Sequence, residues 1–369
     1  MSATSAAVNP APGGAAIPSK KETHRMVWIK RITLSLIVLV VLLVVIAWAW
    51  LALGAAGTWD DDYRHTAATA ELPAFPAATP SAANGITLVS ANDFEFRTRI
   101  AGFDKPFPRG NVIALHGFPE SSIMYAPLLE AASAAGYRIA AFDQRGYSPG
   151  ARPEGAENYR TPLLVEDLFA LADALGFERF HLVGHDWGSA VGWGAVLANP
   201  DRIASWGALS IPHIVAFGRA LSEDPVQRER SSYFGFFALP WIPERFMLRD
   251  NFDGFRATLG EHPASHLDEY QAIFSEPGAL TAALNWYRAG TGDLDGNEPQ
   301  GSPNVSIPTL FIWGNEDMAV SPWSVDAQRE YMLGPFEELE LDTGHWLLET
   351  ATEEVVPKLM AHFAAHPMR

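Results

Sequence analysis

Val183-Gly184-His185-Asp186-Trp187-Gly188 is the stretch on which the fold of this chain depends. The residues before it, 179–182, have the pattern of a strand that enters an apolar core, and those after it, 189–197, are the small and apolar residues of a buried helix. When a helix follows a strand after so tight a turn, the residue at the turn adopts a strained backbone conformation, and its neighbours must be small. Gly184 and Gly188 meet this demand, so we predict a sharp corner with the Asp186 carboxylate at its tip.

Strands and helices alternate on both sides of this corner. The predicted elements are a hairpin of strands 86–89 and 94–98 that turns at Asn92-Asp93, strands 111–115, 137–142, 203–209, 307–313 and 337–341, and an amphipathic helix over 163–175. This alternation is typical of an α/β fold with a doubly wound, mostly parallel sheet, here of eight strands. Residues 212–303 break the pattern, because they carry many aromatic residues and no strand alternation. We therefore predict a helical cap over 212–303, inserted between two parts of the core, 85–211 and 304–369.

The composition of the chain disfavours several kinds of partner. The net charge is −17, which argues against nucleic acid because phosphate binding needs clustered Lys and Arg. The chain has no cysteine, so it forms neither a disulfide nor a thiolate metal site. Its 369 residues, 48% of them hydrophobic, suit one large domain with an insertion and a deeply buried core.

The amino-terminal part of the chain predicts a membrane anchor. Residues 1–31 form a tail that is rich in Ala, Gly, Pro and Ser and ends in a basic stretch, and we expect this tail to be disordered. Residues 32–53 carry no charge, and as a transmembrane helix they would span roughly 33 Å, enough to cross a bilayer. Residues 54–84, with prolines among alanines, predict a linker.

The charges that flank this segment predict its orientation. Basic residues precede it and Asp60-Asp61-Asp62 follow it, so the amino terminus should be cytoplasmic and the folded domain should lie on the non-cytoplasmic side. A cleaved signal peptide is the alternative, since Gly54-Ala55-Ala56 offers small residues for cleavage. The apolar segment is longer than the roughly 7–15 residues usual for a signal peptide, which favours an uncleaved single-span anchor.

Chemically active residues follow three of the predicted strands. Asp186 follows the strand at the corner, Asp317 follows the last strand but one, and His345 follows the last strand. The carboxyl ends of parallel strands meet at one edge of a sheet, so we expect these side chains to lie together. The order nucleophile, acid, histidine is that of α/β-hydrolases. Glu316 and Asp342 are alternative candidates for the acid.

Two loops near this edge carry further candidates. His116-Gly117-Phe118-Pro119-Glu120-Ser121 is the first, and in this fold an oxyanion hole takes one backbone N–H from that loop and one from the residue after the nucleophile. These are the N–H groups of Phe118 and Trp187, and the alternative for the loop taken alone is an ordinary turn that contains proline. The second loop is Asp143-Gln144-Arg145-Gly146-Tyr147-Ser148. We interpret its Asp and Arg as structural braces, with a substrate carboxylate clamp at Arg145 as the alternative.

These motifs resemble those of α/β-hydrolase-fold epoxide hydrolases. Two further motifs belong to the resemblance, Leu284-Asn285-Trp286-Tyr287-Arg288 in the predicted cap and Gly344-His345-Trp346 near the end, and it runs from about residue 86 to residue 365. It implies that Tyr233 and Tyr287 hold the epoxide oxygen. It also implies that the substrate is contacted by His116, Phe234 and Trp286. Tyr287 matches the family pattern well, whereas Tyr233-Phe234 is followed by Gly235, where many relatives carry glutamine.

An aspartate at the corner selects the chemistry. A carboxylate is ionised near neutral pH, so Asp186 needs no base in order to attack. Attack on an ester or amide would give an anhydride, whereas attack on an sp³ carbon that bears a strained ring oxygen or a halide gives a stable ester. His345, oriented by Asp317, would then activate the water that hydrolyses this ester. We therefore predict an epoxide hydrolase that converts a small, lipophilic epoxide into a vicinal diol without a metal or an organic cofactor.

Two other functions stay open. A haloalkane dehalogenase has the same aspartate corner and Trp187, but that family usually adds a second halide donor, either an Asn in the oxyanion loop or another Trp. Here the loop position is Phe118, whose side chain has no donor. A membrane-anchored binding protein with an inactive hydrolase fold would have lost at least one essential residue, and none is missing from the sequence.

Overall fold

The computed structural model describes residues 20–56, 85–104, 106, 108–260, 262–290 and 302–368. Within it the chain divides into two units, Met1–Gly54 and Ala55–Arg369. The predictions for residues 1–19 and 57–84, which belong to the expected tail and linker, lie outside the described residues.

The first unit contains all but the last two residues of one long helix, α1 (Lys20–Ala56). Its part from Met26 to Ala49 is long and apolar enough to cross a membrane. The apolar part thus begins earlier than the predicted span of 32–53. Residues 20–31, which we expected to be disordered, are helical, because Lys and Arg are good helix formers and extend the helix of the apolar segment.

The second unit is built on an eight-stranded sheet with the order β1-β2-β4-β3-β5-β6-β7-β8. The strands from β3 to β8 run parallel to one another, and β2 joins β1 and β4 by antiparallel pairing. The bounds are β1 (Gly85–Ala91), β2 (Phe94–Ala101), β3 (Asn111–Leu115), β4 (Arg138–Phe142), β5 (Phe180–His185), β6 (Ile203–Leu209), β7 (Thr309–Gly314) and β8 (Phe336–Leu341). This topology confirms the predicted α/β fold with a mostly parallel sheet of eight strands.

Local chemistry explains where individual strands begin and turn. The hairpin of β1 and β2 turns at Asn92 and Asp93, as predicted, and these residues adopt φ angles of 50° and 64°. Asn and Asp tolerate this left-handed conformation better than most residues. β7 begins at Thr309 and not at residue 307, because Pro308 has no N–H to donate to a neighbouring strand.

Helices cover both faces of the sheet. The side chains of β3 alternate between two cores, as period-two strand geometry requires. Val112 and Ala114 pack in the core that includes residues of α2 (Ala126–Ala134) and α13 (Thr352–Ala365). Ile113 and Leu115 pack in the core that includes α3 (Thr161–Ala174) and α4 (Trp187–Ala198).

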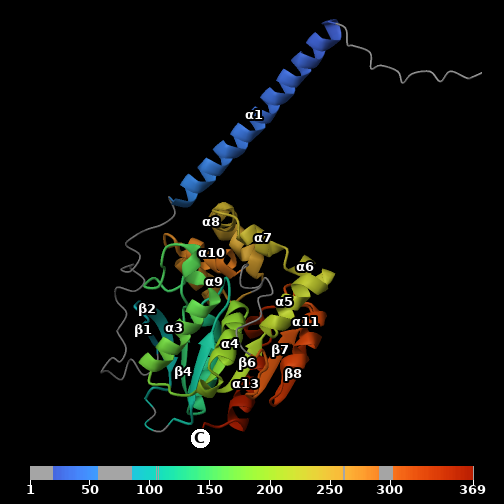
Figure 1. Cartoon of the computed structure of the whole chain (residues 1–369). Helices are drawn as coiled ribbons and strands as arrows, with labels where there is room; N and C mark the ends of the chain where they lie inside the picture. Colours follow the sequence, from blue (N-terminus) through green and yellow to red (C-terminus); the bar gives the residue numbers. More distant parts are fainter. Residues whose placement is uncertain are drawn as a thin grey trace, which may run out of the picture. The chain divides into compact units, whose positions relative to one another are not determined.

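The described residues between β6 and β7 form helices and no named strand. Residues 291–301 of this segment lie outside the described part. The helices are α5 (Ile214–Glu223), α6 (Pro225–Arg230), α7 (Tyr233–Phe237), α8 (Ile242–Leu259), α9 (Ala264–Phe274) and α10 (Ala279–Gly290). Figure 1 shows α7 to α10 gathered at one end of the sheet. Two short helices follow later in the chain, α11 (Pro322–Ala327) and α12 (Leu347–Thr350).

Candidate active site

Asp186 occupies the tip of a sharp corner between β5 and α4. Its backbone angles, φ 51° and ψ −122°, lie where residues other than glycine are rarely found. A Cβ atom on Gly184 would lie 2.4 Å from the carbonyl oxygen of Gly188, and one on Gly188 would lie 2.0 Å from that of Leu115. Both distances are far below van der Waals contact, so only glycine fits at either position, as the sequence predicts.

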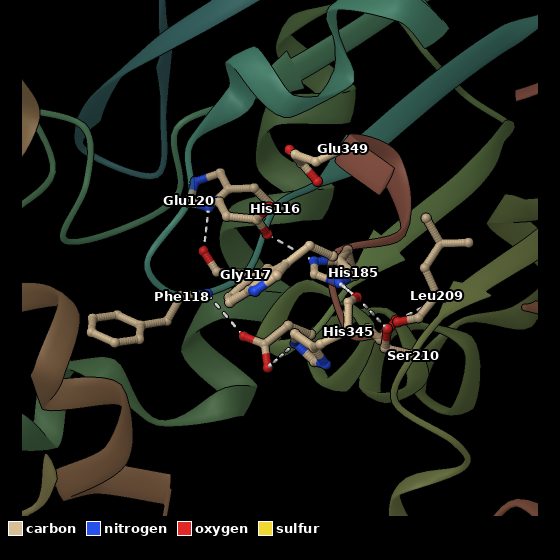
Figure 2. A network of polar contacts seen from close by, with 12 residues as sticks. His116, Gly117, Phe118, Glu120, His185, Leu209, Ser210, His345 and Glu349 are labelled. Atoms are coloured by element: carbon tan, nitrogen blue, oxygen red, sulfur yellow. Dashed lines mark hydrogen bonds and ion pairs between the residues drawn. The ribbon is translucent and has the colours of Figure 1, made fainter. Parts of the chain in front are cut away.

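The Asp186 carboxylate lies between a backbone donor and an imidazole. The N–H of Phe118 donates to Oδ1 at 2.8 Å, and His345 Nε2 lies 3.6 Å from Oδ2. Figure 2 shows the Phe118 ring turned away from this network. A Cβ on Gly117 would lie 2.5 Å from Oδ1, so the loop can approach this closely only with glycine there. Trp187, the other expected donor, is the first residue of α4, where backbone N–H groups lack partners inside the helix.

His345 faces Asp186 with one ring nitrogen and contacts Asp317 with the other. His345 Nδ1 lies 2.8 Å from Asp317 Oδ2, and the other oxygen of Asp317 accepts a backbone N–H at 2.7 Å. Both side chains are buried. Of the alternative acids, Glu316 is exposed, and Asp342 bonds to a neighbouring amide at the surface. The geometry therefore joins Asp317, and neither alternative, to His345.

The His345–Asp317 pair is charged. Burial alone would lower the pKa of His345, but the negative charge of Asp317 and the nearby Asp186 carboxylate raise this pKa well above 6.5. Burial alone would raise the pKa of Asp317, yet the charge of His345 and its hydrogen bond lower this pKa below 3.8. Near neutral pH the pair is an imidazolium and a carboxylate, with the side chain of Asp186 on the other side of the ring.

Two tyrosines from different helices meet beside the corner. The ring centroids of Tyr233 in α7 and Tyr287 in α10 are 6.2 Å apart. Tyr287 makes edge contacts with Trp187 and Phe118, whose centroids lie 5.2 and 5.3 Å from its own. Burial is the main reason why the pKa of each tyrosine lies well above 10, and nearby negative charge adds to it. Both side chains are therefore neutral phenols that retain a proton to donate.

Two other aromatic residues that the resemblance selects lie in the same region. Phe234 stacks on Trp187 with a centroid distance of 6.4 Å. Trp286 contacts Trp187 edge to face at 5.9 Å, and its Nε1 donates to the backbone carbonyl of Arg145 at 2.8 Å. Phe234 and Trp286 thus form part of an aromatic wall around the corner.

His116 lies apart from this aromatic wall. It is fully buried, and both ring nitrogens bond to the backbone. Nδ1 lies 2.8 Å from the carbonyl of Gly117, and Nε2 accepts the N–H of Gln144 at 3.0 Å. This placement favours a role in bracing two loops over the substrate contact that the resemblance implies.

The second loop, residues 143–148, is braced by ion pairs to other elements. Its Asp143 and Arg145 each have a partner outside the loop. Arg145 pairs with Asp167 in α3 at 2.7 Å, and Asp143 pairs with Arg97 in β2 at 2.5 Å. Each side chain therefore ties the loop to a different element. Since the guanidinium of Arg145 is buried in its ion pair, the structure argues against a substrate clamp at this position.

The structure adds a buried chain of contacts that the sequence reasoning did not assign. His185 Nδ1 lies 2.8 Å from Glu120 Oε2, and His185 Nε2 donates to the backbone carbonyl of His345 at 2.9 Å (Figure 2). Ser210 Oγ donates to the same carbonyl at 3.0 Å. The signal in the sequence is a histidine at the end of a wholly buried strand, β5, and an acid in the loop after another buried strand, β3. Polar residues at positions that must be buried need partners.

Comparisons with known proteins agree with the fold. Residues 110–352 match the family model described as the alpha/beta hydrolase fold. The chain is 34% identical over 300 residues to epoxide hydrolase A of Mycobacterium tuberculosis, with 70% of this chain and 91% of that protein covered. It is 32% identical over 268 residues to epoxide hydrolase 3 of Xenopus tropicalis, which covers 69% of this chain and 71% of that protein.

A solved structure extends the likeness to three dimensions. Epoxide hydrolase A from Mycobacterium thermoresistibile matches with a TM-score of 0.60 and 28% identity, over 78% of this chain and 100% of that one. The shared fold, the extent of the family match and the identity to these relatives lead to one conclusion: the chain belongs to the α/β-hydrolase fold family, among relatives that include epoxide hydrolases.

Proposed function

We propose that this protein is an epoxide hydrolase that converts an epoxide into a vicinal diol through a covalent ester on Asp186. One observation carries the proposal. A carboxylate at a strained corner lies between the Phe118 N–H and the His345–Asp317 pair, beside two neutral tyrosines, of which Tyr287 is buried and Tyr233 partly buried. The names of the relatives, epoxide hydrolase A and epoxide hydrolase 3, support the same assignment.

In the first step an oxygen of Asp186 attacks a ring carbon of the epoxide. The C–O bond of the strained ring breaks, and the ring oxygen takes a proton from Tyr233 or Tyr287 as its negative charge develops. We assign the attack to Oδ2, because Oδ1 already accepts the N–H of Phe118. With Oδ2 alkylated, Oδ1 becomes the carbonyl oxygen of the ester and lies where an oxyanion needs its donors.

In the second step water hydrolyses the ester. His345 removes a proton from the water, whose oxygen attacks the Cγ of Asp186. The negative charge on Oδ1 is stabilised by the N–H groups of Phe118 and Trp187. The tetrahedral species then expels the diol oxygen, which takes the second proton of the water, so that Asp186 is again a carboxylate and His345 is again an imidazolium. The tyrosine that lost a proton is restored by the proton that resting His345 gives up before it acts as the base. The sum is one epoxide and one water consumed for one diol.

The aromatic wall supports a lipophilic epoxide as the substrate class. The wall of Phe118, Trp187, Phe234 and Trp286 offers apolar surface and leaves the two tyrosine hydroxyls as the donors to a ring oxygen. A haloalkane dehalogenase is the competing assignment, and Phe118 offers a halide only its backbone N–H.

We also propose that α1 anchors the enzyme in a membrane, with residues 1–31 cytoplasmic and the catalytic domain on the other side. The apolar part of α1 and the basic residues before it support this arrangement. In this arrangement 54–84 is a linker and 212–303 is a cap between the core parts 85–211 and 304–369. Protease protection in sealed vesicles tests the orientation, and a catalytic domain on the cytoplasmic side would contradict it.

The test of the chemistry is a single turnover in water labelled with oxygen-18. Purified protein is screened against aryl epoxides, long-chain fatty epoxides and terminal haloalkanes, and the best substrate is then used below the enzyme concentration. The ester route predicts an unlabelled diol and one labelled oxygen on the peptide that contains Asp186. Direct attack by water predicts a labelled diol and would refute the ester. Asp186→Ala should show no turnover, and halide release without diol formation would favour the dehalogenase.

A further inference from the structure

Three buried side chains from separate parts of the chain converge beside the active site. Glu120 stands in the loop after β3, His262 in the connection between α8 and α9, and Glu349 in α12. All three side chains are inaccessible to solvent. One ligand atom from each lies within 4.8 Å of the others. We call these residues the Glu–His–Glu triad.

Each member of the triad presents an atom that has no hydrogen-bond partner among the described residues. Neither ring nitrogen of His262 is bonded, and its Nε2 lies 3.9 Å from Glu120 Oε1. Glu120 is bonded through Oε2, and its Oε1 has no partner. Glu349 is bonded through Oε1, and its Oε2 has no partner. Buried polar groups without partners are costly, so this arrangement calls for a common ligand.

We propose that the triad binds a divalent transition metal ion, with Zn²⁺ as the first candidate. The donor set is one imidazole nitrogen and two carboxylate oxygens, which suits Zn²⁺ and its neighbours, whereas Mg²⁺ and Ca²⁺ prefer oxygen alone. The charge of the ion balances the two carboxylates. Ligand distances of about 2.0–2.2 Å place tetrahedral ligands about 3.3 Å apart, so the widest pair would close by about 1.5 Å.

Both carboxylates of the triad are held in place by neighbouring histidines. The bonded oxygen of Glu120 is held by His185 at 2.8 Å, and that of Glu349 by His266 at 3.3 Å. Partners of this kind orient carboxylate ligands toward an ion. His262 lies in the connection between α8 and α9, and its ring contacts that of Trp346 edge to face with a centroid distance of 5.2 Å.

Such an ion would link two parts of the protein. His262 comes from the helical segment between β6 and β7, while Glu120 and Glu349 come from the core. Glu120 also contacts His185, which donates a hydrogen bond to the backbone carbonyl of His345. The ion would therefore hold the segment between β6 and β7 next to the catalytic histidine. This role is structural, and it does not depend on the epoxide reaction that we propose.

Metal binding by the full-length protein in detergent tests the proposal. The protein is made without a histidine tag, stripped with a chelator and titrated with Zn²⁺ by calorimetry. Co²⁺ then serves as a probe whose visible absorption reports ligands and geometry. We expect one ion per chain, and at a 100-fold excess over Kd a rise in Tm of roughly 5 °C or more. His262→Gln and Glu349→Gln should each weaken Zn²⁺ binding by at least about tenfold and remove the rise in Tm.

His366→Gln is the matched control, because it removes a histidine outside the triad and should leave binding unchanged. Circular dichroism checks that each variant is folded. The proposal is overturned if the parent protein shows no saturable binding at micromolar Zn²⁺. It is equally overturned if folded His262→Gln and Glu349→Gln bind as the parent does, since the ion would then be an adventitious surface ligand.

Discussion

Replacing His345 by Gln should separate the two proposed chemical steps. Alkylation uses Asp186 and the tyrosines, none of which this substitution touches. Hydrolysis needs a general base, and glutamine cannot take a proton from water. Loss of a general base costs about 10²–10⁴-fold in rate, which corresponds to roughly 3–5 kcal/mol of barrier. The Phe118 N–H belongs to another loop and still holds Oδ1, so the ester should form and persist.

The same substitution removes the partner of a buried charge. Asp317 is inaccessible to solvent and contacts the ring at 2.8 Å, and removing one partner of a buried ion pair typically costs about 3–5 kcal/mol of stability. A variant that carries both His345→Gln and Asp317→Asn leaves no unpaired carboxylate. This double variant is the control for folding, and it should accumulate the same ester.

The assay is intact-protein mass spectrometry after mixing with an epoxide that the parent protein turns over. The variant should become heavier by one substrate, and the adduct should lie on the peptide that contains Asp186. Asp186→Ala should show neither adduct nor turnover. If both folded His345 variants are inactive and never accumulate an adduct, the histidine is needed for the first step, and the covalent aspartyl route is wrong. An adduct on another residue would equally displace Asp186 from its proposed role.

The remaining predictions concern the tyrosines, pH and the corner. Tyr233→Phe and Tyr287→Phe should each slow epoxide opening by about 10²–10⁴-fold, and full single-turnover activity in the double variant would contradict proton donation by the pair. Because folding lowers the pKa of Asp317 below 3.8, its contribution to stability is complete above about pH 4 and is lost as the pH falls through the folded pKa. Denaturant unfolding of parent and Asp317→Asn should therefore differ most near neutral pH and converge in acid, and a difference independent of pH would speak against this coupling. Gly188→Ala brings a Cβ within 2.0 Å of the backbone carbonyl oxygen of Leu115, so it should lower the free energy of unfolding by about 3 kcal/mol or prevent folding. Gly235→Ala is the control and should be tolerated, because its Cβ would meet no atom within 4 Å. Equal Tm values for the two variants would show that the corner relaxes.

The sequence predicts the part of the site that local pattern determines. A strand is recognised from its own residues, and the residue that follows it must lie at the edge of the sheet. Asp186, Asp317 and His345 could therefore be placed together without knowledge of any contact between them. The glycines around Asp186 are equally local, because the steric demand comes from the turn itself.

Contacts between distant segments could not be predicted in this way. The brace at Arg145 is an example, since its partner is Asp167 on α3 and not the aspartate two residues earlier in its own loop. The burial of His116 is another, because its ring direction depends on where Gln144 passes. The distance between His262 and Glu349 depends on how the segment between β6 and β7 folds back over the core, which no periodicity records.

The charges of the site explain how one histidine can accompany an ionised nucleophile and later act as a base. In the resting protein His345 lies between the side chains of Asp186 and Asp317, and both favour the imidazolium, which cannot take a proton from water. Ester formation turns the Asp186 carboxylate into a neutral group and removes one of the two charges that hold this proton. The pKa of His345 must then fall, and the released proton can return to the tyrosine that donated one to the ring oxygen. In the proposed reaction the first step therefore produces the base that the second step needs. A serine at the same corner has no charge to lose, which ties this sequence of events to the aspartate.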